Sequence, residues 1–129
     1  MTRFFVTEGP TDAALISKVL REIGYDGFDV RYAGGKNYVP SFARSLALYE
    51  DKPVMAVMDS DTMDPALVRK QELVFNDFVT SVALSSPLEL ALAIPNLEHA
   101  IGEESFIEQL TNFLEVDFLL KRQGFELRR

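Results

Sequence analysis

Four acidic side chains follow two apolar stretches of the chain, and their types and spacing favour metal chemistry. Glu8 and Asp12 flank a Gly-Pro turn after the first stretch, and Asp59 and Asp61 come after the second, Val54–Met58. Ligands of open α/β sheets bind at the carboxyl ends of parallel strands, so we expect one shared acidic site. Carboxylate oxygens suit Mg²⁺ or Mn²⁺. If the four side chains converge, the site could hold one or two such ions.

A purely structural interpretation of the same acids stays open. Asp59-Ser60-Asp61 could be a solvated turn that leads into a helix cap. Glu8 could be a loop acid, and Asp12 could be a first-turn residue that the helix dipole favours.

Lys36 is a candidate for contact with a phosphate. It follows Gly34 and Gly35, where a flexible backbone could let its ammonium group reach a phosphate. It does not complete a Walker A motif, because residue 30 is Val where the leading Gly should be. An exposed lysine in a glycine turn is the alternative.

Apolar spacing predicts strands that alternate with helices over the first two thirds of the chain. Strands are expected at 3–7, 28–33, 54–58 and 78–84. The helices between them are expected at 11–23, from about Pro40, and after Asp64. This alternation is typical of a single α/β domain, residues 1–129, with a mainly parallel four-stranded sheet flanked by helices.

Individual residues predict the limits and the inner faces of these helices. Thr11 is the expected N-cap of the first helix and Gly24 its stop, whereas Pro65 opens the third. The third helix is expected to turn three apolar residues inward, Leu67, Val68 and Phe75.

The last third of the sequence predicts extra C-terminal helices. Residues 88–94 form a short apolar run that Pro95 breaks. Apolar spacing from Phe106 to Leu114 predicts a helix, and Phe118–Gln123 a further one that Gly124 stops.

Composition excludes several classes of site. The chain has no cysteine, which excludes disulfides, thiolate metal sites and thiol catalysis. His99 is the only histidine, so a histidine-rich zinc centre would need partners; we expect a surface or packing role for it. No signal-peptide pattern or long apolar run is present, so we expect a cytoplasmic protein without a membrane span.

The net charge of −7 is unevenly distributed. Residues 51–120 contain three basic and thirteen acidic side chains, whereas residues 121–129 contain four basic and one acidic. This balance argues against tight nucleic-acid binding by the isolated domain, although a divalent cation or a basic partner could reverse it locally. The late basic residues could contact nucleic acid or an acidic partner, or form a solvated tail: Lys121, Arg122, Arg128 and Arg129.

The acidic motifs carry a resemblance to a known family. Glu8-Gly9-Pro10-Thr11-Asp12 after one apolar strand and Asp59-Ser60-Asp61 after another resemble the signature of the Toprim domain of primases, topoisomerases and nucleases. The Gly-Gly-Lys stretch makes the OLD-family nuclease type of Toprim the most similar one. The resemblance covers about residues 3–85.

The resemblance implies a Toprim-like sheet between helices and a magnesium-dependent phosphodiester chemistry. It implies that Glu8 is a general acid or base or a metal ligand, that Asp59 and Asp61 are metal ligands, and that Asp12 completes the cluster. OLD-type domains also recruit a late acidic residue, which makes Glu98 a candidate extra ligand; a plain surface acid is the alternative. Lys36 is the candidate for steadying a phosphate.

Two other motif families fit less well. The Asp59-x-Asp61 pair is similar to the nucleophile motif of haloacid-dehalogenase-type phosphatases, but that motif needs Thr or Val where this chain has Met63. A dinucleotide site is excluded because no Gly-x-Gly-x-x-Gly is present.

Two functions of different class are therefore expected. The first is a Mg²⁺- or Mn²⁺-dependent nuclease of DNA or RNA, or the catalytic subunit of one, with Glu8 and Lys36 as catalytic residues. The second is a non-catalytic Toprim module that binds and regulates a partner such as an ATPase. The small size and acidic surface of the chain motivate the second.

Overall fold

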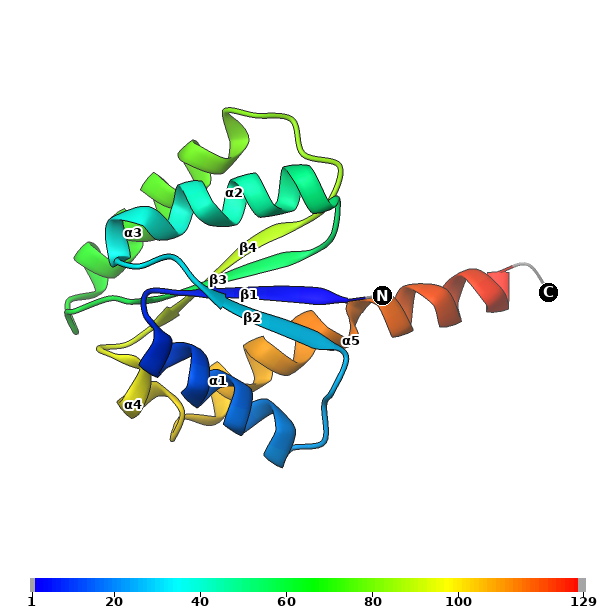
Figure 1. Ribbon diagram of the computed structural model, residues 1–129, viewed down its shortest axis with the longest axis horizontal. Helices are drawn as coiled ribbons and strands as arrows, with labels where there is room; N and C mark the ends of the chain where they lie inside the picture. Colours follow the sequence, from blue (N-terminus) through cyan, green and yellow to red (C-terminus); the bar gives the residue numbers. More distant parts are fainter. Residues whose placement is uncertain (1, 128–129) are drawn as a thin grey trace.

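The computed structural model describes the backbone of residues 2–127 and the side chains of residues 2–115. Strands and helices alternate along the chain (Figure 1). Their bounds are β1 Arg3–Thr7, α1 Pro10–Glu22, β2 Phe28–Tyr32, the 3₁₀ turn η1 Lys36–Tyr38, α2 Val39–Glu50, β3 Val54–Asp59, α3 Pro65–Thr80, β4 Leu88–Ala93, α4 Leu97–Ala100 and α5 Glu104–Leu127.

The four strands form one parallel sheet in the order β2-β1-β3-β4. Helices α2 and α3 cover one face, and α1, α4 and α5 cover the other (Figure 1). The expected α/β class and the four-stranded, helix-flanked sheet are thus confirmed, and the arrangement is consistent with a Toprim-like fold.

The central strands are apolar on both sides because helices cover both faces of the sheet. In β1, Phe5 belongs to the core on the α1–α5 side, whereas Phe4 and Val6 belong to the core on the α2–α3 side. In β3, Met55 and Val57 likewise belong to the core on the α1–α5 side. These two cores hold β1 and β3 side by side, which sets where their carboxyl ends lie.

The prediction of a fourth strand at 78–84 is wrong. Residues 78–80 are the end of α3, and the fourth strand is β4, Leu88–Ala93. Phe75 and Val79, four residues apart, both pack on the core of the α2–α3 face, so the helical period continues past Phe78. The short apolar run before Pro95 is the strand.

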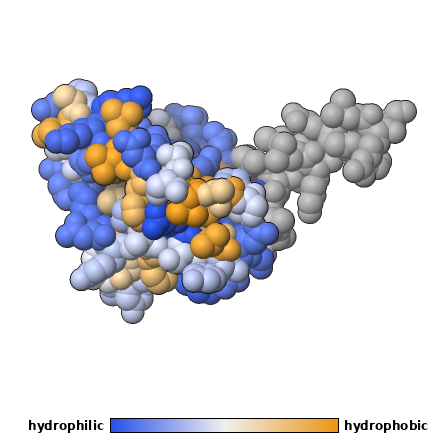
Figure 2. All heavy atoms as spheres, turned by 90° about the horizontal axis from the view of Figure 1, so that it is seen from above, coloured by the Kyte–Doolittle hydropathy of each residue, from blue (hydrophilic) through white to orange (hydrophobic). Residues whose placement is uncertain are grey.

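Two of the three residues expected on the inner face of α3 lie there, and the third does not. Leu67 is 49% exposed, whereas Phe75 is 4% exposed and Val68 is half-buried. The inward stripe therefore starts at Val68, and Leu67 faces solvent. Figure 2 looks onto the α2–α3 face and shows hydrophobic groups there in separate patches among hydrophilic ones.

The helix ends differ from the predictions in two places. The N-cap of α1 is Gly9 with Pro10 at the first helical position, instead of Thr11. At the other end of the chain, α5 continues through Gly124 to Leu127 as one helix, where two had been expected. A glycine inside a helix costs only about 1 kcal/mol relative to alanine and need not end it. Gly24, at φ +97°, follows the end of α1 as expected.

Among the described residues, no helix is long and apolar enough to cross a membrane.

Candidate metal centre

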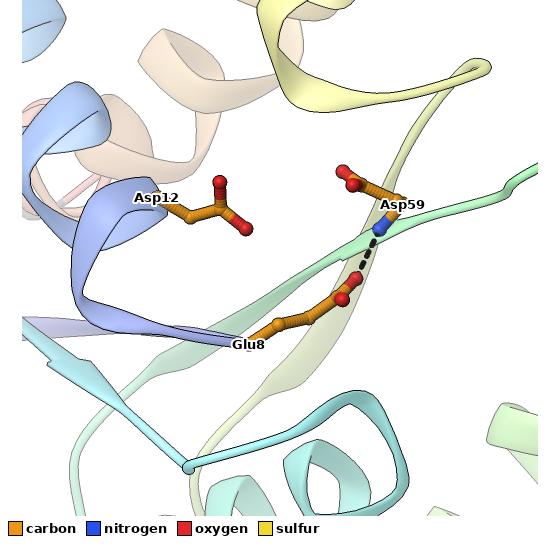
Figure 3. Close-up of side chains that lie close together, drawn as sticks. All are labelled: Glu8, Asp12 and Asp59. Carbon is orange, nitrogen blue, oxygen red and sulfur yellow. Dashed lines mark hydrogen bonds between the residues drawn. The ribbon is translucent and has the colours of Figure 1, made fainter.

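Three carboxylates meet at the carboxyl ends of β1 and β3 (Figure 3). Glu8 follows β1 directly, Asp59 ends β3, and Asp12 lies in the first turn of α1. One oxygen atom from each lies within 4.8 Å of the others. Opposite ligands of an octahedral Mg²⁺ are about 4.2 Å apart and adjacent ones about 3 Å, so small side-chain rotations would bring the three onto one ion.

The loop after β2 holds the backbone of Glu8. The carbonyl oxygen of Glu8 accepts hydrogen bonds from Gly34 N–H at 3.0 Å and Gly35 N–H at 2.8 Å. These bonds fasten the glycine loop over the end of β1. The side chain of Glu8 then reaches across to β3, where its Oε2 accepts from Asp59 N–H at 2.6 Å.

Asp59 is oriented by the start of α4. Its Oδ1 accepts a hydrogen bond from Leu97 N–H at 2.9 Å, and Asn96 caps the same helix. The sequence had not indicated Leu97 as part of the site, because a backbone amide has no residue-specific signal. The Pro95-Asn96 pair is the only hint, since it is typical of a helix start.

All three carboxyl groups have raised pKa values. Burial, followed by the charges of Glu8 and Asp12, raises the pKa of Asp59 to about 6. Burial also raises the pKa of Glu8, against the lowering effect of the Asp59 N–H bond and the Lys36 ammonium. The pKa of Asp12 is raised by burial and by the charge of Glu98. Because a neighbouring negative charge contributes to each of the three shifts, a cation placed among the carboxylates would be stabilised.

The raised pKa of Asp59 predicts a pH-dependent stability in the absence of metal. The folded protein holds this proton up to about pH 6, whereas the unfolded chain releases it near 3.8. The contribution of Asp59 to stability is therefore complete below about pH 4 and is lost as the pH rises through 6. After allowance for solvent screening, the loss is about 1 kcal/mol.

Urea denaturation in EDTA at pH 4 and pH 7 checks this expectation. The Asp59→Asn variant should exceed the wild type by about 1 kcal/mol at pH 7 and match it at pH 4, because Asn carries no charge. A difference that is the same at both pH values would contradict it.

Asp61 lies outside the group of three carboxylates, among the residues whose side chains are described. Its backbone is left-handed, at φ +57°, and its N–H donates to Pro95 O at 2.8 Å. The Asp61 side chain is 64% exposed and pairs with Lys36, whose Nζ donates to Oδ2 at 2.8 Å. The structure therefore brings Glu8, Asp12 and Asp59 together and places Asp61 with the lysine.

Lys36 is positioned by Gly34 and Gly35. Both glycines have positive φ, +91° and +153°. An added Cβ would meet nothing within 4 Å at Gly34, so a substitution there tests the backbone conformation alone. Gly34→Ala should destabilise the protein by about 1–2 kcal/mol, because L-residues other than glycine are strained in this region.

Denaturation of a matched pair of variants measures this cost. Gly27 also has open space around its Cβ position but no positive φ. Gly27→Ala should be within about 0.5 kcal/mol of the wild type or slightly stabilising. Equal stability of the two variants would show that the loop does not depend on the left-handed conformation.

The remaining predicted residues lie at the edge of the site or beyond it. Glu98 is exposed on α4 and does not join the group of three, although its charge acts on Asp12. His99 is exposed and faces Glu103 at 3.6 Å, as a surface histidine would. The side chains of the late basic residues fall outside the described part: Lys121, Arg122, Arg128 and Arg129.

Comparisons with known proteins add no evidence on the function of this site. No protein-family model matches the sequence, and searches of curated proteins and of solved structures return no match. The resemblance to the Toprim domain therefore depends on the two acidic motifs and on the parallel sheet that brings three of their carboxylates together.

Proposed function

We propose that this chain is a Mg²⁺- or Mn²⁺-dependent enzyme that hydrolyses phosphodiester bonds of DNA or RNA, or the catalytic subunit of one. The observation that supports the proposal is the meeting of Glu8, Asp12 and Asp59 at the carboxyl edge of a parallel sheet. Ligand-binding sites of open α/β sheets lie at this edge. Half-buried carboxylates with raised pKa values are more typical of functional sites than of solvated turns.

The three carboxylates would hold the metal ion. Bound there, the ion would lower the pKa of a water molecule and neutralise charge that develops on the phosphate. Asp59 and Glu8 are both held by hydrogen bonds, Asp59 through its Oδ1 and its N–H and Glu8 through its Oε2. Glu8 lies near an ammonium and another carboxylate, and its pKa is raised mainly by burial, which makes it the candidate for proton transfer.

Lys36 would contact a phosphate oxygen of the substrate. Its ammonium group is near enough to Glu8 to lower the pKa of that carboxyl. Its partner Asp61 is mostly exposed, so the ion pair is screened and weak. A phosphate that enters the site can therefore replace Asp61 as the partner of Lys36 at small cost.

The acidic surface sets the conditions of the test. With a net charge of −7, the chain should bind nucleic acid weakly, so the assay needs high concentrations of protein and substrate. Single- and double-stranded DNA and RNA would be incubated with Mg²⁺, Mn²⁺ or EDTA. We expect cleavage of at least one substrate with either metal and none with EDTA.

Calorimetry with Mn²⁺ separates the ways in which the proposal could fail. Absence of both cleavage and Mn²⁺ binding would reject the metal centre. Binding of Mn²⁺ without cleavage of any substrate would reject the enzyme and favour a non-catalytic module.

A further inference from the structure

A hollow of about 280 Å³ opens on the α2–α3 face of the sheet. Its walls are mainly apolar, and most of the apolar side chains come from β3, β4 and α3: Met58, Leu90, Leu92, Val74, Phe75 and Phe78. We call it the α3 hollow. Its volume is near the lower limit for small-molecule sites, about 300–1,000 Å³, and suits one flat ring system.

The α3 hollow lies next to Lys36 along the chain. Asn37, in its wall, directly follows Lys36, whereas Met58, also in its wall, precedes Asp59 but points to the opposite face of the sheet. Gln71 lines the hollow as well, and its Nε2 donates to the carbonyl oxygen of Ser60 at 2.9 Å. A ligand whose phosphate lies at Lys36 would therefore have its adjoining group close to the mouth of the hollow.

The wall of the hollow also contains an acceptor that lacks a partner. Oε1 of Gln71 is buried and accepts no hydrogen bond from any residue that the structure describes. An unpaired buried acceptor destabilises the folded protein. An N–H group brought in by a ligand would satisfy it after a small movement of the side chain. The exposed amide of Asn37 is a second polar group at the hollow.

We infer that the α3 hollow binds the base of a nucleotide whose phosphate is held beside Lys36. A nucleobase combines a flat ring with N–H groups at its edge and an attached phosphate, which matches apolar walls, an unpaired acceptor and a neighbouring ammonium. Splayed bases commonly contact aromatic side chains in this way. The inference specifies the substrate of the proposed phosphodiester hydrolysis and rests on it for the position of the phosphate.

Binding of nucleotides in EDTA tests the hollow without metal or cleavage. The probes are AMP, CMP, GMP and UMP, and the control ligand is ribose 5-phosphate, which has the phosphate but no base. We expect at least one nucleotide to bind ten-fold or more tightly than ribose 5-phosphate, by calorimetry or by NMR titration. Equal affinity for all five ligands would overturn the inference.

Two substitutions on α3 locate the binding. Val74 lines the hollow and is 61% exposed, so Val74→Trp can occupy its mouth without disturbing the core. Leu73 is 46% exposed and does not line the hollow, which makes Leu73→Trp the matched control. Val74→Trp should lower nucleotide affinity to that of ribose 5-phosphate, and Leu73→Trp should leave it unchanged.

The outcomes test the binding of a base in the α3 hollow separately from the proposed enzymatic function. Base-dependent binding that Val74→Trp removes would support the hollow even if no substrate is cleaved. Metal-dependent cleavage with nucleotide binding that is insensitive to Val74→Trp would overturn the hollow and leave the enzyme in place. A change in oligomeric state on Val74→Trp, without a change in nucleotide binding, would assign the hollow to a second copy of the chain and overturn the inference.

Discussion

Asp59→Asn should lower metal-dependent cleavage at least about 100-fold and weaken Mn²⁺ binding at least about ten-fold, because the carboxylate lies at the centre of the candidate site. Asn removes one negative charge and keeps the oxygen that accepts from Leu97 N–H. The loss should therefore come from charge at the metal and not from a displaced α4. Cleavage rates and calorimetric titration with Mn²⁺ measure the two effects.

Thermal unfolding of the same variant gives an internal check. Without metal at pH 7, Asp59→Asn should be more stable than the wild type, because it relieves repulsion from Glu8 and Asp12. Addition of Mn²⁺ should stabilise the wild type more than the variant. A variant that loses both activity and stability would have lost its fold instead.

Asp77→Asn is the matched control for the charge change. Asp77 is an exposed acid on α3 and belongs to neither the group of three carboxylates nor the α3 hollow. The Asp77→Asn variant should cleave the substrate and bind Mn²⁺ as the wild type does. Cleavage by Asp59→Asn at the wild-type rate would remove the basis of the proposed function.

The first three strands could be predicted because their sequence pattern follows from their surroundings. A strand covered on both faces needs apolar residues on both sides, and Val54–Met58 has them without interruption. The same pattern places Glu8 and Asp59 at neighbouring strand ends, since parallel strands bring their carboxyl ends to one edge. The convergence of Glu8 and Asp59 could thus be predicted from the sequence.

The fourth strand could not be predicted by the same reasoning. Residues 78–84 contain valine, threonine and phenylalanine, which favour strands, but Phe75 and Val79 pack on the core with helical spacing. Tertiary packing outweighs local preference there. In β4, by contrast, the alternation is partly hidden because alanines, Ala91 and Ala93, fill the side toward α4 and α5.

The position of Asp61 depends on a backbone feature that the sequence does not reveal. One residue, Ser60, separates it from Asp59, so an extended chain would point both carboxylates to the same side. The left-handed conformation at Asp61, held by Pro95 O, turns its carboxylate toward Lys36. Sequence spacing alone therefore predicts the same position for both carboxylates, whereas the structure separates them.

Replacement of Asp61 and replacement of Lys36 should have different effects on metal binding and on cleavage. Asp61→Asn should bind Mn²⁺ within about three-fold of the wild type, because its carboxylate lies outside the group of three. Asn also tolerates the left-handed backbone, so the loop is kept. Lys36→Met should lower kcat/KM about 100-fold, because a phosphate would lose its ammonium partner, while Mn²⁺ binding is kept or strengthened.

Calorimetry and steady-state cleavage on the two variants decide what Asp61 does. The methionine keeps the apolar stem of Lys36 and removes only the charge, and it also removes the cation that lowers the pKa of Glu8. If Asp61→Asn weakens Mn²⁺ binding as much as Asp59→Asn does, Asp61 is a metal ligand, as the resemblance to the Toprim domain implies. If only Lys36→Met impairs cleavage, the three carboxylates hold the metal, and Asp61 is the exchangeable partner of the lysine.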